Sequence, residues 1–367
     1  MPDPDHRRPT MRDVAERAGV SFKTVSRVVN HEGGVRPEPV DSVRAAVAEL
    51  GYRPDDRARR LRQGDSRAGT IGFVLVDIAN PFFSSIMRGI EAVAQEHDTL
   101  LLAASTDGDQ DRENQIVNAF VARRVDGLIV VSSGSADGPL AVELDRGSPV
   151  VFLDLEPSNL RGDLVRGDHF GGSVLATEHL LAHGHVDIAF FGDESSVFSA
   201  RLRREGFCEA MHAAGLRVDD ERIVHGRHTD DVWREIIRDY MRRPKAPTAM
   251  FTAQNFVTLG AVGALHDLDL HHRVAMVGFD EITLADAIEP GITTVPQHPL
   301  ELGRAAARQL FARIEGSDEP FVHLVAPSTV IERGSGEIRP DQVEKTVEAR
   351  FVPRESPSSP SAIRFIT

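Results

Sequence analysis

Residues 11–63 begin with MRDVAERAGVSFKTVSRVVN and end with RPDDRARRLRQ, and the organisation of the whole chain can be worked out from this stretch. Its first part has the pattern of two short helices around a tight turn. Thr10 and Asp13 form a capping-box-like start. Gly19 ends the first helix, where a positive φ is easily adopted, and Ser21 can cap the second helix. The pattern predicts a helix-turn-helix.

The second helix has an apolar and a polar face. Val25, Val28 and Val29 recur at helical spacing and are expected to point inward. A helix-turn-helix presents the N-terminal end of its second helix to base edges in the major groove. An ordinary solvated face is the alternative for the hairpin taken alone. The candidate DNA-binding residues at this end are Ser21, Phe22, Lys23, Thr24, Ser26 and Arg27.

A third helix follows, with an apolar stripe of Val40, Val43, Val47 and Leu50, closed by Gly51. Three helices of this size cannot bury a large core, so they favour a small DNA-reading domain over a catalytic one. We place this helix-turn-helix domain at residues 10–53, after a disordered N-terminus over residues 1–9.

Residues 54–63 have helical composition and four arginines, and we predict a hinge helix there. So short a helix is unstable alone in water, so it should order only against a partner, and arginines suit phosphates. Leu61, exposed on a basic helix, is a candidate wedge in the minor groove. Ala58 and Arg59 are expected beside it at the DNA. A plain linker helix is the alternative.

AERAGVSFKTVSRVVN followed by ELGYRPDDRARRLRQG resembles the DNA-binding head of the lactose-repressor (LacI/GalR) family of bacterial transcription regulators. The resemblance continues to about Arg333. It implies that Phe22, Lys23 and Arg27 read an operator half-site, and that Leu61 wedges into the centre of a palindrome.

Charge separates the two parts of this 367-residue chain. Residues 1–67 hold 14 Lys and Arg against 11 Asp and Glu, a net +3, whereas the remaining 300 hold 28 against 45, a net −17. The acidic body should repel DNA and leave binding to the head. The single cysteine, Cys208, fits a reducing compartment. No apolar run precedes the first helix, so we expect no signal peptide, no membrane span and a cytoplasmic location.

Residues 68–334 alternate apolar strands with amphipathic helices twice over, which predicts a two-lobed α/β effector-binding and dimerisation domain with parallel sheets. The resemblance implies a periplasmic-binding-protein-like fold whose C-terminal pieces, FVHLVA and STVIER, cross back between the lobes. We expect lobe 1 at about 68–165 and 298–326, and lobe 2 at about 166–297 and 327–334. Residues 335–367 are expected to be a flexible tail.

Ligands of such folds bind at the carboxyl ends of the parallel strands. By the resemblance, Arg203 binds effector hydroxyls or a carboxylate, Asp280 accepts hydrogen bonds from the effector, and Phe82 or Phe83 packs on it. A lobe-closing salt bridge and a core aromatic are the respective alternatives. The full candidate effector site is Asn80, Phe82, Phe83, Asp154, Arg203, His228, Asn255, Phe256 and Asp280.

The effector is expected to be a carbohydrate, but two departures leave its class open. His228 stands where the family often has an aromatic ring, and Gln254 with Asn255 stand where Asn-Asp is common. A pocket with one acid fewer could hold a neutral, an acidic or a phosphorylated sugar.

The segment HLLAHGH contains His179, His183 and His185 and suggests a possible metal site. It lacks the Glu of an HExxH arrangement, so we expect no metal. No nucleophile motif and no GxxxxGK phosphate loop is present. We therefore expect no cofactor and no enzymatic activity.

The sequence predicts an effector-controlled transcriptional regulator, most simply a repressor, bound as a homodimer to a palindromic operator on double-stranded DNA. An activator or a corepressor-dependent repressor is an alternative. A sugar-binding transport protein of the same fold is the rival interpretation, and it would lack the head.

Leu61→Ala should lower the affinity for the specific operator by about tenfold or more and leave non-specific binding almost unchanged, because phosphate contacts carry the latter. Mobility-shift titrations on the operator and on an unrelated duplex of equal length measure the two affinities. An equal loss on both duplexes would contradict the wedge.

Overall fold

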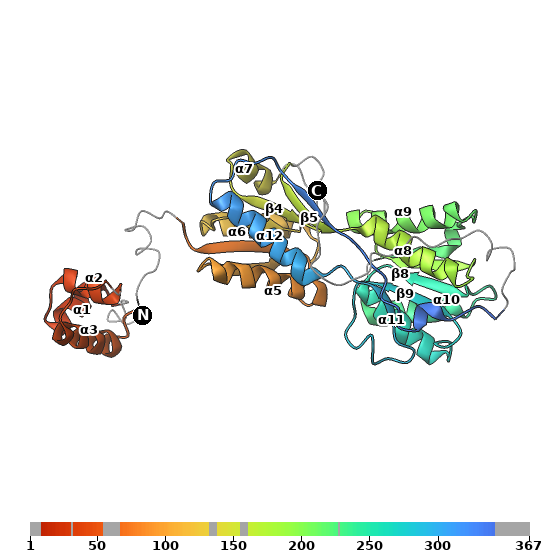
Figure 1. Ribbon diagram of the computed structural model, residues 1–367, viewed down its shortest axis with the longest axis horizontal. Helices are drawn as coiled ribbons and strands as arrows, with labels where there is room; N and C mark the ends of the chain where they lie inside the picture. Colours follow the sequence, from red (N-terminus) through yellow and green to blue (C-terminus); the bar gives the residue numbers. More distant parts are fainter. Residues whose placement is uncertain are drawn as a thin grey trace. The chain divides into compact units, whose positions relative to one another are not determined.

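The structure is a computed structural model that describes residues 9–30, 32–53, 67–131, 138–154, 161–226 and 228–341. The chain divides into two compact units, residues 1–69 and 70–367, and we treat each by itself (Figure 1). Ala58, Arg59 and Leu61 of the predicted hinge helix lie outside the described residues.

The first unit is a three-helix head. Thr10 and Asp13 make the predicted capping box, Ser21 caps the second helix, and Gly19 and Gly51 end helices in the left-handed conformation, with φ of 65° and 62°. The helices are α1 (Met11–Ala18), α2 (Phe22–Val29) and α3 (Pro37–Leu50). Their common core is Val14, Val25, Val43, Ala46 and Tyr52. The head fold expected from the sequence is confirmed.

Lobe 1 of the second unit is a parallel sheet in the order β11-β5-β4-β3-β1-β2. Helices α5 and α12 pack on one face, and α6 and α7 on the other (Figure 1). The strands are β1 (Thr70–Leu75), β2 (Leu100–Ser105), β3 (Leu128–Val130), β4 (Val150–Leu153), β5 (Asp163–Gly167) and β11 (His323–Ala326). The helices are α5 (Pro81–Glu96), α6 (Gln110–Ala122), α7 (Pro139–Asp145) and α12 (Pro299–Ile314).

Lobe 2 repeats the plan with the order β10-β9-β8-β6-β7. Helices α8 and α9 cover one face, and α10 and α11 the other. Its strands are β6 (Ile188–Gly192), β7 (Ile223–His225), β8 (Ala249–Thr252), β9 (Ala275–Phe279) and β10 (Thr293–Val295). Its helices are α8 (His169–Ala182), α9 (Phe198–Ala213), α10 (Asp230–Met241) and α11 (Asn255–Asp267), and η1 (Asp220–Arg222) is a 3-10 turn.

The chain passes between the lobes at the carboxyl ends of three strands, β5, β10 and β11 (Figure 1). The first passage leads into α8 and the second into α12. After the third passage, Ile331 pairs with Thr294 of β10 through two backbone hydrogen bonds, with N–O distances of 2.8 and 3.1 Å. The crossing-back that the resemblance implied is therefore present, although STVIER forms this isolated bridge rather than a full strand.

Helix α12 lies unusually close to α5. A Cβ atom on Gly89 would overlap the carbonyl oxygen of Leu300, and one on Gly303 would overlap that of Ile86. Two glycines, one from each helix, therefore allow the backbones to touch. This contact anchors the second passage, because α12 begins only a few residues after β10.

Apart from the 3-10 turns, three short elements of the described residues were not predicted from the sequence: α7, β5 and β7. Strand β5 runs to Gly167, so the first passage lies two residues later than the expected lobe boundary at 165.

The start of the expected flexible tail is folded instead. A 3-10 turn, η2 (Ser335–Glu337), packs on lobe 2. The Ser335 hydroxyl donates to the carbonyl of Met276 at 2.7 Å, and the carbonyl oxygen of Ile338 lies 2.7 Å from Nε2 of His185. Residues 335–341 therefore belong to the packed unit, because this turn supplies polar partners to buried groups of lobe 2.

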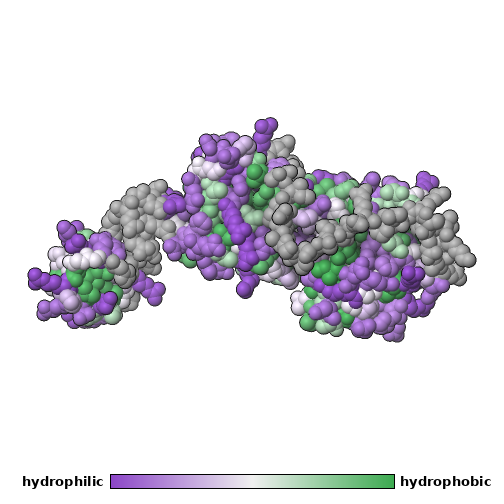
Figure 2. All heavy atoms as spheres, viewed as in Figure 1, coloured by the Kyte–Doolittle hydropathy of each residue, from purple (hydrophilic) through white to green (hydrophobic). Residues whose placement is uncertain are grey.

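Hydrophilic and hydrophobic residues are intermixed on the coloured part of the visible face of both lobes (Figure 2). Within the described ranges, no helix combines the length and the apolar character needed to cross a membrane.

Glu337→Gln tests the η2 contact. The Glu337 carboxylate lies 2.5 Å from Nε2 of His179 and accepts a hydrogen bond from Thr293 Oγ1 at 2.9 Å. Burial would raise the pKa of Glu337, but these hydrogen bonds outweigh it and hold the pKa below the ordinary 4.5. A lowered pKa in the folded state stabilises the fold above the unfolded-state pKa and stops doing so as the pH falls through the folded value.

We therefore expect Glu337→Gln to lower the free energy of unfolding by about 1–2 kcal/mol near neutral pH. The difference should shrink as the pH falls below the ordinary glutamate pKa of 4.5. Urea unfolding at about pH 7 and about pH 4 measures it. Glu332→Gln is the control, because that side chain is 68% exposed and 3.8 Å from His179. A pH-independent difference would contradict the prediction.

Candidate functional site

The face of α2 predicted to read DNA is accessible. Phe22 is 48% exposed, an uncommon state for a large aromatic side chain, and Lys23 beside it is exposed. Arg27, one turn further, is part-exposed, and its Nε lies 3.9 Å from the Glu32 carboxylate. An ion pair this long and exposed contributes little, so phosphate or base contacts can replace it.

The other predicted residues of α2 have structural partners. Ser21 Oγ accepts from the backbone N–H of Thr24 at 3.1 Å, and the two hydroxyls lie 2.9 Å apart. Ser26 Oγ accepts from Asn30 at 3.2 Å. These three side chains shape the ends of α2, and their predicted DNA contacts remain predictions.

Buried polar side chains gather where the strands of both lobes end. Asp154 directly follows β4, Asp280 directly follows β9, and Asn80 lies in the loop after β1, where it caps α5. Arg203 comes from α9 and Asn255 from the start of α11. All five are less than one-tenth exposed. The structure thus brings together five of the nine predicted effector-site residues.

Arg203 is held rigidly in this cluster. Its Nη1 donates to the carbonyl of Ala253 at 2.7 Å and lies 4.0 Å from Oδ2 of Asp280. Its Nη2 donates to Nδ1 of His169 at 3.3 Å. The guanidinium carbon lies 4.2 Å from the ring centroid of Phe279. The planar group is thereby fixed on both its edge and its face.

The two carboxyl groups have opposite environments. Burial raises the pKa of Asp280, although Arg203 and a hydrogen bond from Gln297 act against the rise. Burial also acts on Asp154, but there His169 and Arg203 outweigh it, so its pKa is lowered. Both residues have a left-handed backbone, with φ of 64° for Asp154 and 71° for Asp280. Such strain in non-glycine residues tends to cluster at functional sites.

One contact joins side chains of the two lobes directly. Nδ2 of Asn255 donates to Oδ1 of Asn80 at 2.7 Å, and the same oxygen accepts from the backbone N–H of Phe82 at 3.0 Å. Side chains from α11 of lobe 2 and from the β1 loop of lobe 1 therefore meet one another.

Three buried atoms of the cluster make no hydrogen bond to any described residue: Arg203 Nε, Asp154 Oδ1 and Gln297 Oε1. Asp154 Oδ1 lies 3.2 Å from Nε2 of His169, but that nitrogen makes its hydrogen bond to the Asp154 carbonyl. Buried polar atoms without partners are rare. One donor and two acceptors are what a ligand with several hydroxyl groups can satisfy.

Four predicted residues lie outside this polar network. Phe82 and Phe83 are buried in the lobe 1 core with ring centroids 5.2 Å apart. His228 is exposed, and its ring stacks edge-on against Trp233 at 5.2 Å. Phe256 is half-buried at the start of α11. Their proposed contacts with an effector remain predictions.

His169 and Gln297 belong to the cluster, yet the sequence analysis missed both. Gln297 follows β10, so the rule that found Asp280 would have found it too. His169 follows β5, a strand that was itself missed. We call the seven residues Asn80, Asp154, His169, Arg203, Asn255, Asp280 and Gln297 the inter-lobe cluster.

The histidines of HLLAHGH have separate structural partners. His179 pairs with Glu337, and Nδ1 of His183 lies 2.8 Å from the carbonyl of His179. His185 is buried between Thr248 and Ile338. In the described ranges, no set of three or more His, Cys, Asp or Glu side chains is placed to hold a metal ion.

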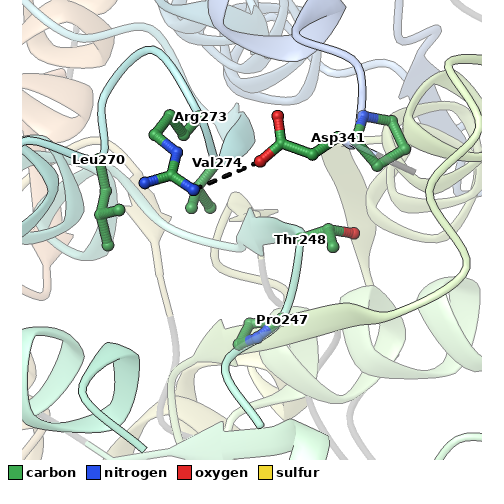
Figure 3. Close-up of a pocket in the computed structure, with 7 residues that line it drawn as sticks. Pro247, Thr248, Leu270, Arg273, Val274 and Asp341 are labelled. Atoms are coloured by element: carbon green, nitrogen blue, oxygen red, sulfur yellow. Dashed lines mark hydrogen bonds and ion pairs between the residues drawn. The ribbon is translucent and has the colours of Figure 1, made fainter. Parts of the chain in front are cut away.

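A hollow of about 350 Å³ lies elsewhere on lobe 2 (Figure 3). It is formed at the amino ends of β8 and β9, by Thr248 and Val274 among others, and an exposed ion pair of 3.3 Å between Arg273 and Asp341 spans it. The predicted effector site lies at the carboxyl ends of the strands, so this hollow is at the opposite edge of the sheet. None of the predicted effector residues lines this hollow.

Two family models match the chain. Residues 10–55 match the model of bacterial regulatory proteins of the lacI family. Residues 68–331 match the model of periplasmic binding proteins and the sugar binding domain of the LacI family. The two matches coincide with the head and with the two-lobed unit.

The chain is 33% identical over 330 residues to the ribose operon repressor of Escherichia coli (strain K12), covering 89% of this chain and 99% of that protein. It resembles the solved transcriptional regulator CelR–cellobiose complex at 30% identity, with a TM-score of 0.66 and coverage of 89% and 100%. It also resembles the lac repressor dimer bound to operator and the anti-inducer ONPF, at 26% identity, with a TM-score of 0.76 and coverage of 90% and 99%.

A DNA-reading head, two parallel-sheet lobes with a polar cluster between them, and relatives that match nearly end to end lead to one assignment. This chain belongs to the LacI family of bacterial regulatory proteins, as a DNA-binding transcriptional regulator with a sugar-binding type of domain.

Proposed function

We propose that this protein is a repressor whose affinity for a palindromic operator is controlled by a neutral sugar bound in the inter-lobe cluster. The observation that carries the proposal is the set of buried atoms without partners, Arg203 Nε, Asp154 Oδ1 and Gln297 Oε1, in a chain that also has an exposed DNA-reading face. These atoms point to a ligand that both donates and accepts hydrogen bonds.

The charges of the cluster favour a neutral ligand. Among its seven residues, Arg203 is the permanently cationic side chain, and it already faces two carboxyl groups, Asp154 and Asp280. An acidic or phosphorylated sugar would bring more negative charge into a buried site whose cation is already compensated. Hydroxyl groups can instead donate to the oxygens and accept from Arg203 Nε. CelR in its complex with cellobiose is a relative that holds such a sugar.

Exposed apolar side chains on the second unit support a homodimer. Leu100, on the edge strand β2, is 71% exposed, and Leu284 after β9 is 65% exposed. An edge strand with an exposed leucine is a surface that proteins normally cover. A dimer would present two heads to the two halves of a palindrome. The similar lac repressor was solved as a dimer on its operator.

Release of DNA by the sugar is the simplest form of this control, and promotion of DNA binding is the alternative. A transport-type protein has no use for a DNA-reading head, so the match of residues 10–55 favours the regulator. The relatives are repressors, which supports the expectation of no enzymatic activity.

The head can be tested before its operator is identified. Selection from random duplexes with the full chain should yield a palindrome. Lys23→Ala should then weaken binding to it about tenfold, because Lys23 lies on the exposed end of α2. Arg44→Ala, which removes an exposed cation from α3 of the same head, is the matched control and should have a smaller effect. Equal losses of operator affinity in the two variants would contradict the assignment of α2 as the helix that reads the bases.

The sugar site can be tested by thermal unfolding of the full chain with D-ribose, cellobiose and ribose 5-phosphate. A neutral sugar at a hundred times its Kd should add about 2.7 kcal/mol of stability. Arg203→Lys should weaken the binding of this sugar at least about tenfold, because a lysine cannot make the planar contacts of the guanidinium group. Arg201→Lys on the same helix, whose side chain is 48% exposed, should bind it normally. A shift with the phosphate alone would overturn the neutral class.

A further inference from the structure

His169 is a histidine with no exposed surface at the point where the chain first passes from lobe 1 to lobe 2. It is the first residue of α8, directly after the N-cap Asp168. Its ring lies between Asp154, at the end of β4 in lobe 1, and Arg203, on α9 in lobe 2. It therefore touches the two lobes at once, inside the inter-lobe cluster.

The partners of His169 determine where its proton lies. A guanidinium can only donate, so Nδ1, which is 3.3 Å from Nη2 of Arg203, must accept. Nε2 lies 3.2 Å from the carbonyl oxygen and 3.2 Å from Oδ1 of Asp154, both acceptors, so Nε2 must carry the hydrogen. The geometry requires a neutral ring protonated on Nε2.

In this form His169 supports both sides of the site. Its hydrogen bond to the Asp154 carbonyl holds a residue whose backbone is left-handed, with φ of 64°. Its acceptor nitrogen fixes one amino group of Arg203, while the carbonyl of Ala253 fixes the other at 2.7 Å. Arg203 Nε and Asp154 Oδ1, the atoms left for a ligand, are thereby aimed by one ring.

We propose that His169 is a positioning residue for the effector site: as a neutral Nε2–H ring it links Asp154 of lobe 1 to Arg203 of lobe 2 and sets the effector affinity. The inference rests on the proposed function, because it concerns the same sugar site. It predicts that the polar pattern of the ring, and not its volume, is required.

Protonation of Nδ1 would turn the acceptor into a donor facing the Arg203 amino group and would place two cations together. Charged groups near the ring include Asp154 from the end of β4, Arg203 from α9 and Asp280 from the end of β9, and the uncharged ring of Phe279 packs at 6.3 Å. The neutral Nε2–H form is therefore the one that fits these partners.

Two variants separate positioning from packing. His169→Gln keeps one donor and one acceptor and cannot be protonated, whereas His169→Leu keeps apolar volume alone. D-ribose and cellobiose are the probes, with affinities from calorimetry on the full chain.

We expect His169→Leu to lose at least about tenfold in affinity and His169→Gln to lose less. His183→Gln, on the same helix outside the cluster, is the control and should keep the wild-type affinity. Leu and Gln variants that bind alike would overturn the proposal.

A measurement without ligand keeps the inference separate from the proposed function. Histidine side-chain ¹⁵N spectra of the full chain distinguish the two neutral tautomers, and His169→Gln identifies the signal. An Nε2–H tautomer near pH 8 supports the proposal, and an Nδ1–H or doubly protonated ring overturns it. If neither sugar binds the wild type, the sugar assignment fails while the tautomer still decides the role of His169.

Discussion

The polar site depends on one buried cation. Arg203 is 5% exposed, and a guanidinium taken out of water is tolerated only where acceptors surround it. Those acceptors come from separate elements: a carbonyl after β8, the ring of His169 and the carboxyl group of Asp280. All of these groups lie in lobe 2. The link to lobe 1 runs through His169, whose Nε2 lies 3.2 Å from the carbonyl oxygen of Asp154 at the end of β4.

Parallel sheets make this convergence possible. Every strand of both lobes runs the same way as its neighbours, so all the carboxyl ends of one sheet lie along one edge. The three passages between lobes also leave from carboxyl ends, which brings His169 and Gln297 into the same region. The second passage is anchored by the contact between Gly89 and α12. The polar site and the connections between the lobes thus lie in the same region, at the carboxyl ends of the strands.

Much of this could be predicted from the sequence because its signals are local. The capping box of Thr10, the left-handed Gly19 and the polar residues after β4 and β9 each follow from neighbouring residues. The strand β5 was missed for a non-local reason. Its first residue, Asp163, is fully buried, which looks wrong for a core strand, but its carboxylate accepts from Nε of Arg313 at 2.7 Å. Arg313 is 150 residues away in sequence.

The same limit applies within the site. Periodicity places Phe82 and Phe83 on α5, but only packing shows that both rings lie in the lobe 1 core. It places His228 before α10, yet its contact with Trp233 depends on how that helix meets the sheet. Asn80 and Asn255, in contrast, were found because their positions at strand or helix ends carry the signal. Which strand-end residues meet across the lobes is a tertiary property.

The direct contacts between the lobes bear on how an effector can act. The Asn80–Asn255 hydrogen bond and the His169 contact with Asp154 join the lobes through protein groups alone. A ligand shifts the balance between two lobe arrangements only through its difference in affinity for them. Since these contacts already favour closure, a sugar that merely bridges the lobes adds to an existing bias. A sugar that replaces the partners of Arg203 or Asp154 changes the bias itself. Coupling between two ligands is reciprocal. If the sugar changes the affinity of the protein for the operator by some factor, the operator must change the affinity for the sugar by the same factor.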